Sequence, residues 1–139
     1  MDEHAGAHPV DIESFRAVMR EAGIEEVVDA TLEIYQSEAP GIFGALNQAV
    51  ESGDADGIQA QAHGLKSSSG NIRATRLAGL LQQLESLGRD GDVPAAEGLF
   101  PDVVREYHAV MAFLAESRRD SSGIVGVLPA RIWAQIQCR

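Results

Sequence analysis

Aromatic side chains, cysteines and lysines are scarce in this chain of 139 residues. Only 5% of the residues are aromatic, so aliphatic side chains must fill the core. The single cysteine, Cys138, cannot form an internal disulfide bond, which fits a reducing compartment. No apolar run approaches the roughly 20 residues that a membrane-spanning helix requires, and the polar residues 1–9 do not resemble a signal peptide. These absences predict a cytoplasmic protein that does not enter the membrane.

Basic residues are also few, and they are unevenly placed. The chain has 11 basic and 21 acidic residues, a net charge of −10 and a pI near 4.7. Nucleic-acid binding requires clustered cations, so this balance argues against a nucleic-acid partner. Residues 1–56 contain 13 acids and two arginines, whereas residues 57–84 contain no acid and hold Arg73, Arg76 and Lys66, the only lysine. Such a local cationic patch suggests that an anionic group is handled there.

The apolar periodicity is helical, without strand-like alternation or an internal repeat. Five helices are expected, over residues 11–22, 24–52, 58–71, 74–88 and 94–115. Val18 and Ile34 are counted among the inward-facing residues of the first two. Pro40 predicts a kink or brief break in the second helix, and Gly88 is expected to cap the fourth. The predicted fold class is all-α: an antiparallel four-helix bundle with the short N-terminal helix packed across one end.

Length and composition suggest one domain with two short extensions. Residues 10–117 are expected to form the bundle, and residues 1–9 a disordered N-terminus. Residues 118–123 read as a polar linker, and residues 124–139 form an apolar, slightly basic tail that contains Trp133 and no acid. The tail is compatible with packing on the bundle, with contact to a partner, or with an unstructured end.

His63 stands out by its position in the third helix. A stripe spaced by four, three, four and three residues should face the core; it consists of Ile58, Ala62, Leu65, Ser69 and Ile72. His63 lies off this stripe, so its imidazole should point outward, with Lys66 about one turn away. A neutral imidazole is a nucleophile. Lys66 could donate to an anionic group there and offset its charge.

The residues around His63 match the motif of a known family. The segment Ala62-His63-Gly64-Leu65-Lys66-Ser67-Ser68-Ser69, followed by Ala74 and a leucine-rich helix ending in Gln83-Leu84-Glu85, resembles the histidine-containing phosphotransfer (HPt) domain of bacterial two-component multistep phosphorelays. The resemblance covers about residues 10–117. It implies that His63 is the phosphorylated histidine and that Lys66 stabilises the phosphoryl charge. Ser67 and Arg73 stand where the family usually has glycines.

The resemblance also implies a reaction and partners. A phosphoryl group would pass from the phospho-aspartate of a receiver domain to His63, and then to the receiver of another response regulator. The partners would be these receiver domains and a sensor or hybrid histidine kinase, and the protein itself would be a monomer. No cofactor or metal is expected on this chain, since Mg²⁺ would belong to the receiver domain. The candidate docking residues are Gln59, Ser67, Ser68, Gly70, Arg73 and Arg76.

Other functions are weighed against this one. The chain contains no Gly-rich phosphate loop and no Walker lysine motif, so autonomous kinase activity is not expected. An HPt-like regulator that binds a kinase or receiver without carrying phosphate is the alternative; His63 argues against it, and Arg73 leaves it open. A metal-carboxylate bundle enzyme needs inward-facing Glu-x-x-His pairs, and the chain has none.

Overall fold

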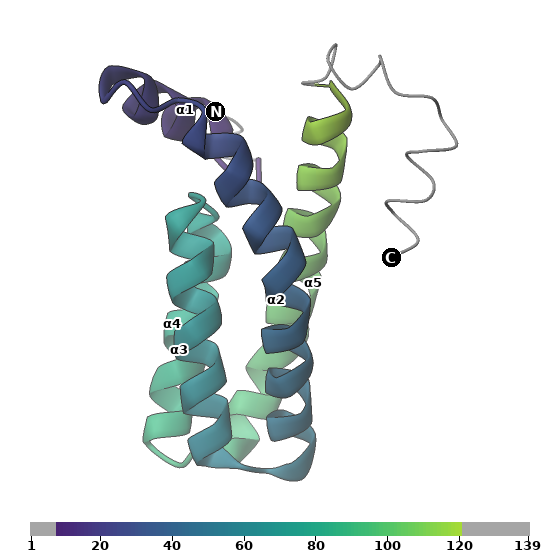
Figure 1. Cartoon of the computed structure of the whole chain (residues 1–139). Coiled ribbons are helices and arrows are strands. Elements are labelled where there is room, and N and C mark those ends of the chain that lie inside the picture. Colours follow the sequence, from purple (N-terminus) through teal and green to yellow (C-terminus); the bar gives the residue numbers. More distant parts are fainter. Residues whose placement is uncertain (1–7, 121–139) are drawn as a thin grey trace, which may run out of the picture.

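The computed structural model describes residues 8–120, with side chains described through residue 117. Within this range the chain forms five helices and no strand: α1 Ile12–Glu21, α2 Val27–Ser52, α3 Ala55–Asn71, α4 Thr75–Arg89 and α5 Val93–Asp120 (Figure 1). The predicted all-α fold is therefore confirmed for the described residues. None of their helices is both long and apolar enough to cross a membrane. The disordered N-terminus predicted for residues 1–9 and the tail lie largely outside the described range.

The four longer helices surround a common apolar core. α2 contacts α3, α3 contacts α4, α4 contacts α5, and α5 contacts α2, while α1 contacts α2 at one end of the molecule (Figure 1). The largest fully buried side chains include Leu32, Leu46, Ile58, Leu65, Leu81 and Leu114. Burying one such side chain contributes about 1.5–3 kcal/mol. Because these residues come from α2 to α5, packing between helices, not helix propensity alone, holds the elements together.

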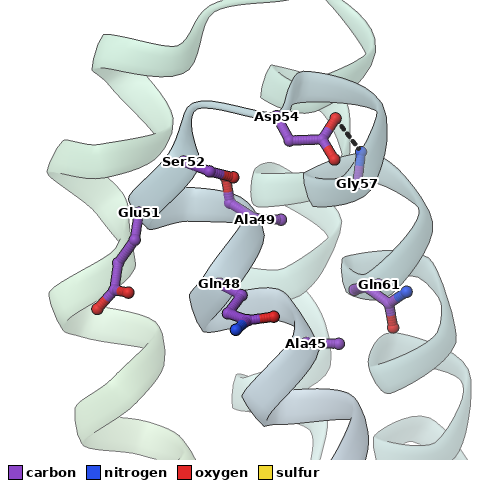
Figure 2. A pocket seen from close by; sticks show the side chains of 8 residues that line it. All are labelled: Ala45, Gln48, Ala49, Glu51, Ser52, Asp54, Gly57 and Gln61. Atoms are coloured by element: carbon purple, nitrogen blue, oxygen red, sulfur yellow. Dashed lines mark hydrogen bonds between the residues drawn. The ribbon is translucent and has the colours of Figure 1, made fainter.

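Aspartates begin three of the helices. Asp54 accepts a hydrogen bond from the backbone N–H of Gly57 at 3.0 Å, at the start of α3 (Figure 2). Asp11 and Asp92 accept in the same way at the starts of α1 and α5. Each carboxylate satisfies an N–H group that has no partner inside the helix. The turn before α3 also needs Gly53, whose φ of 70° is a left-handed conformation.

The two prolines inside helices do not interrupt them. α2 runs through Pro40 and α5 runs through Pro101, so the brief break considered at Pro40 does not occur. Pro40 lies on the exposed side of α2, where water can satisfy the carbonyl that loses its N–H partner. α2 changes direction along its length (Figure 1), and α5 continues to Asp120, past the predicted end at residue 115 and into the predicted linker.

The prediction for Gly88 is wrong, because this residue is not the C-cap of α4. The helix continues to Arg89, and the left-handed glycine is Gly91, with a φ of 73°. Gly88 is instead buried against the backbone of α3. A Cβ atom at this position would lie 2.7 Å from the N atom of Gln59 and 3.0 Å from the O atom of Ala55. The missing side chain lets α3 and α4 approach closely.

Val18 and Ile34 were expected to face inward, and this expectation is also wrong. Val18 is 44% exposed and Ile34 is 56% exposed. Figure 1 shows the first turns of α2 extending beyond the end of α3, with α1 packed at that end. In this part of α2 only one side of the helix is buried, the side that includes Val28, Leu32 and Tyr35.

Candidate functional site

His63 projects from the face of α3 that does not contact the core. The predicted stripe is confirmed, because Ile58, Ala62, Leu65 and Ser69 are fully buried. The side chain of His63, by contrast, is 62% exposed. An outward-facing imidazole follows directly from the 100° offset between His63 and the neighbouring stripe residue.

A buried hydrogen bond fixes α3 relative to α2. The Tyr35 hydroxyl and the Ser69 Oγ atom lie 2.9 Å apart, and both residues are buried. Burial raises the pKa of Tyr35 to about 12. The phenol therefore stays neutral at physiological pH, and it satisfies the buried Ser69 hydroxyl with a hydrogen bond.

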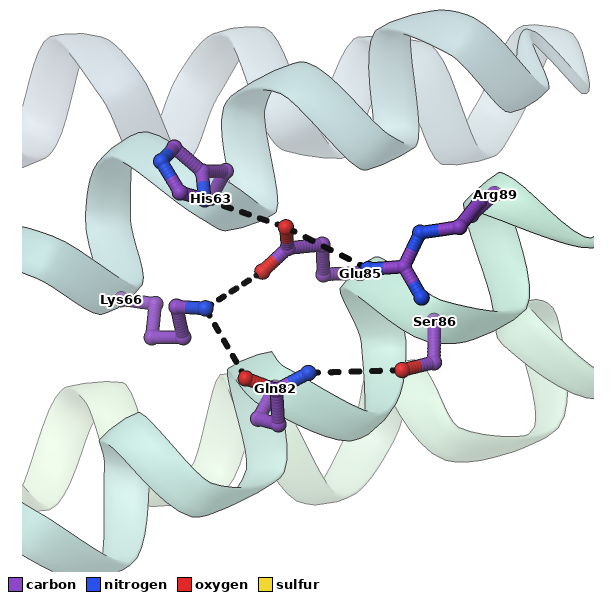
Figure 3. Close-up of polar contacts among 6 residues, drawn as sticks. All are labelled: His63, Lys66, Gln82, Glu85, Ser86 and Arg89. Carbon is purple, nitrogen blue, oxygen red and sulfur yellow. Dashed lines mark hydrogen bonds and ion pairs between the residues drawn. The ribbon is translucent and has the colours of Figure 1, made fainter.

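Glu85 of α4 binds the imidazole of His63. Its Oε2 atom lies 3.0 Å from Nδ1 of His63, and its side chain is only 9% exposed (Figure 3). A carboxylate accepts hydrogen bonds, so this contact assigns the ring proton to Nδ1. The neutral imidazole then carries its free lone pair on Nε2, which points away from Glu85 (Figure 3).

The same carboxylate also binds two cationic side chains. Nζ of Lys66 lies 2.7 Å from Oε1 of Glu85 and donates to Oε1 of Gln82 at 2.9 Å. Nη2 of Arg89 lies 3.6 Å from Oε2 of Glu85 (Figure 3). The hydrogen bond from Lys66 is the main reason why the pKa of Glu85 lies below its ordinary value, although burial acts in the opposite direction. Glu85 is therefore ionised at neutral pH, with two cations around one anion.

Sequence reasoning did not assign Glu85, Gln82 or Arg89 to the site. Glu85, which lies just beyond the acid-free stretch, neutralises part of the positive charge that was predicted for this patch. One signal was present: Glu85 follows Leu81 by four residues and Leu84 by one, on the buried side of α4. A buried carboxylate is rare unless it is paired, so this acid required a cationic partner.

Four of the candidate docking residues lie along α3 near His63. Ser67 is exposed, while Gln59, Ser68 and Gly70 are half-buried. Ser68 donates to the carbonyl oxygen of Gly64 at 3.3 Å, so its hydroxyl is turned toward its own helix. Although Gln59 lies one turn before His63, it is Glu85 that binds Nδ1 of the imidazole.

Arg73 and Arg76 make contacts elsewhere. The guanidinium of Arg73 lies 5.6 Å from the centre of the Phe15 ring on α1, and Arg76 pairs with Glu106 of α5 at 3.4 Å. The φ of Arg73 is 68°, a left-handed conformation that favours glycine, which gives a physical reason for the usual glycine there. The stacking on Phe15, worth about 0.5–1 kcal/mol, offsets part of the conformational cost. The roles of Arg73 and Arg76 in docking stay predictions.

Within the described part of the chain, no group of three or more His, Cys, Asp or Glu side chains could hold a metal ion.

Comparisons with known proteins agree with this geometry. The Hpt domain family matches residues 30–113. Among solved structures, histidine-containing phosphotransfer protein B (HptB) from Pseudomonas aeruginosa PAO1 is similar, with 26% sequence identity and a TM-score of 0.69, over 80% of this chain and 95% of that one. No curated protein matches the chain significantly. Since the family match spans more than half of the sequence, and includes His63 and Glu85, this chain belongs to the Hpt domain family.

Proposed function

We propose that this protein is a phosphorelay intermediate. It accepts a phosphoryl group on His63 from the phospho-aspartate of one receiver domain and passes it to the receiver of another response regulator. One observation carries the proposal: an exposed imidazole whose Nδ1 is bound by a buried, ionised Glu85, so that Nε2 faces solvent. Membership of the Hpt family and the likeness to a phosphotransfer protein support it. We infer the family's antiparallel four-helix bundle for α2 to α5.

The transfer step follows from the position of the ring proton. The Nε2 lone pair attacks phosphorus, an N–P bond forms, and the P–O bond to the aspartate breaks, with its electron pair leaving on the carboxylate. The imidazole ring becomes positively charged because Nδ1 keeps its proton. Glu85 stabilises that charge through its hydrogen bond. In the second transfer the ring leaves as neutral imidazole, so the same geometry serves both directions.

Lys66 and Arg89 supply the positive charge at the site. The Lys66 ammonium is bound to Glu85 and Gln82 and remains 25% exposed. A phosphoryl group on Nε2 would compete with Glu85 for this ammonium, and Arg89 would remain to balance the carboxylate. Phosphoryl transfer depends mainly on such positioning and charge neutralisation. The chain needs no cofactor of its own in this scheme, because the receiver domain supplies the aspartate and the Mg²⁺.

The partner domain docks over small side chains next to His63. Because Ser67 and Gly70 are small, the active site of another domain can approach the outer face of α3 and reach the imidazole. Ser68 also borders a small pocket together with Ile34 and Glu38 of α2. We propose that a monomer acts in this way in the cytoplasm, with a sensor or hybrid histidine kinase upstream.

The test is phosphorylation of His63 variants by a phosphorylated receiver domain. His63→Gln should abolish acid-labile, base-stable labelling while leaving the helical circular-dichroism spectrum unchanged. His108→Gln is the matched control, because His108 is also exposed but lies on α5, and it should be labelled like the wild type. Labelling that persists in His63→Gln would refute the assignment. Receiver binding without any labelling of the wild type would instead favour the non-phosphorylated regulator.

A further inference from the structure

Gln82 binds Lys66 at the edge of the polar cluster around Glu85. Nζ of Lys66 donates to Oε1 of Gln82 at 2.9 Å, and Nε2 of the same amide donates to the Ser86 hydroxyl at 3.4 Å (Figure 3). A side-chain amide has one accepting and one donating end, and only the oxygen can accept a hydrogen bond from an ammonium group. The contacts with Lys66 and Ser86 therefore agree on one orientation of the Gln82 amide.

The spacing along α4 explains why Gln82 and Glu85 bind the same ammonium group. Gln82, Glu85 and Arg89 are separated by three and four residues, so they lie on one side of the helix. Lys66 reaches this side from α3, with Nζ 2.9 Å from Oε1 of Gln82 and 2.7 Å from Oε1 of Glu85. One turn of α4 thus provides two acceptors for one cation of α3.

The two acceptors differ in charge, and this difference matters when a phosphoryl group is present. Glu85 is an anion that also binds His63 and Arg89, whereas the amide of Gln82 is neutral. A lysine ammonium has three N–H donors; Gln82 and Glu85 accept from two of them, so one remains for a phosphoryl oxygen. An anionic phosphoryl group repels a carboxylate far more strongly than a neutral amide. The hydrogen bond from Lys66 to Gln82 can therefore persist while the phosphoryl group is on His63.

We infer that Gln82 is a positioning residue for phosphotransfer at His63 and that it acts through Lys66. Its amide oxygen keeps the ammonium group beside Glu85, where the remaining N–H donor serves the phosphoryl group. Without Gln82 the ammonium would keep only one of its two acceptors, and the flexible stem of Lys66 would be free to carry it into solvent. Ordering such a side chain costs conformational entropy, and Gln82 offsets this cost before the receiver domain arrives. The inference rests on the proposed function.

The ordering of Lys66 can be measured without any phosphotransfer. Lys66 is the only lysine, so a chain labelled with ¹³C-lysine gives one Cε signal in NMR spectra, and its order parameter reports the motion of this side chain. We expect the order parameter to fall in Gln82→Met, which has a similar length but only a weak acceptor. It should not change in the control Gln83→Met, at the next exposed position of α4. An unchanged order parameter in Gln82→Met would overturn the inference.

Single-turnover transfer from a phosphorylated receiver domain tests the consequence for the reaction. Loss of one hydrogen bond of ordinary net strength corresponds to about fivefold, so Gln82→Met should lower the rate at saturating receiver by about this factor. The receiver concentration at half-saturation should not change. In the Lys66→Ala background the same substitution should have no effect, because Gln82 acts through Lys66. An effect that persists in that background, or a change in the half-saturation concentration alone, would indicate direct contact of Gln82 with the receiver and would overturn the inference.

A second variant separates positioning from charge. Gln82→Glu keeps an oxygen for Lys66 but adds a negative charge beside Glu85, so Lys66 should stay ordered while the transfer at saturating receiver becomes slower. A wild-type rate in Gln82→Glu would overturn the role assigned to the neutral amide. Failure of the proposed function gives a different result, because no protein would then be labelled by the receiver, whereas the Lys66 signal would still respond to Gln82→Met.

Discussion

The contact between α3 and α4 at Gly88 allows a quantitative prediction. In Gly88→Ala the new methyl group would lie 2.7 Å from the Gln59 N atom and 3.1 Å from its Cα atom, whereas ordinary contacts begin at 3.4 Å. Both neighbours are backbone atoms, so no side chain can move aside and the two helices must separate. Overpacking of this kind costs about 1–3 kcal/mol.

A second glycine of α4 supplies the control. Gly79 is exposed, and a Cβ atom there would meet nothing within 4 Å. Both substitutions gain the roughly 1 kcal/mol by which alanine exceeds glycine in a helix. This gain cancels when the variants are compared, so Gly88→Ala should be about 1–3 kcal/mol less stable than Gly79→Ala.

Thermal unfolding and phosphotransfer rates provide the assay. The stability difference corresponds to a melting temperature that is lower by about 3 °C or more for Gly88→Ala. Glu85 lies one turn before Gly88, and His63 lies one turn after Gln59, so the same separation should lengthen the 3.0 Å contact between them and slow the transfer. A melting temperature for Gly88→Ala at or above that of Gly79→Ala would contradict this prediction.

Four further predictions concern the polar contacts. Lys66→Ala should slow phosphotransfer without abolishing it, because Arg89 remains near Glu85; an unchanged rate in a receiver assay would remove Lys66 from the mechanism. Glu85→Gln keeps an acceptor for Nδ1 but loses its charge, which should slow transfer by about fivefold for a loss near 1 kcal/mol. The folded-state pKa of Glu85 lies below its ordinary 4.5, so ionised Glu85 stabilises the fold above pH 4.5, and this stabilisation is lost as the pH falls through the lowered pKa. In urea titrations, the free energies of unfolding of the wild type and of Glu85→Gln should therefore converge in acid. A difference between them that stays constant with pH would contradict this prediction. Ultraviolet titration should show a phenol that ionises at about 12 and disappears in Tyr35→Phe; two tyrosines that both ionise near 10 would contradict the burial of the Tyr35 phenol, which is what raises its pKa.

Much of the fold could be predicted because it follows from local periodicity. The stripe from Ile58 to Ile72 specifies which face of α3 is buried, and it leaves His63 outside with Lys66 one turn away. Predictions that depended on neighbouring elements were weaker. Ile34 fits an inward pattern in sequence, yet at this point of α2 the side with Leu32 and Tyr35 faces the core and Ile34 is left 56% exposed. Gly88 resembles a helix terminator, but its role is set by the α3 backbone beside it.

The sequence by itself determined the helices, the outward direction of His63 and, through the motif around it, the family. Those properties depend on residues within one or two turns of each other. The tertiary structure alone decided that Glu85, 22 positions further along the chain, binds Nδ1 of His63, and that Lys66 shares this carboxylate. The physical reason is that hydrogen bonds and ion pairs act over a few ångströms, and only the close packing of α4 on α3 brings these side chains within that distance.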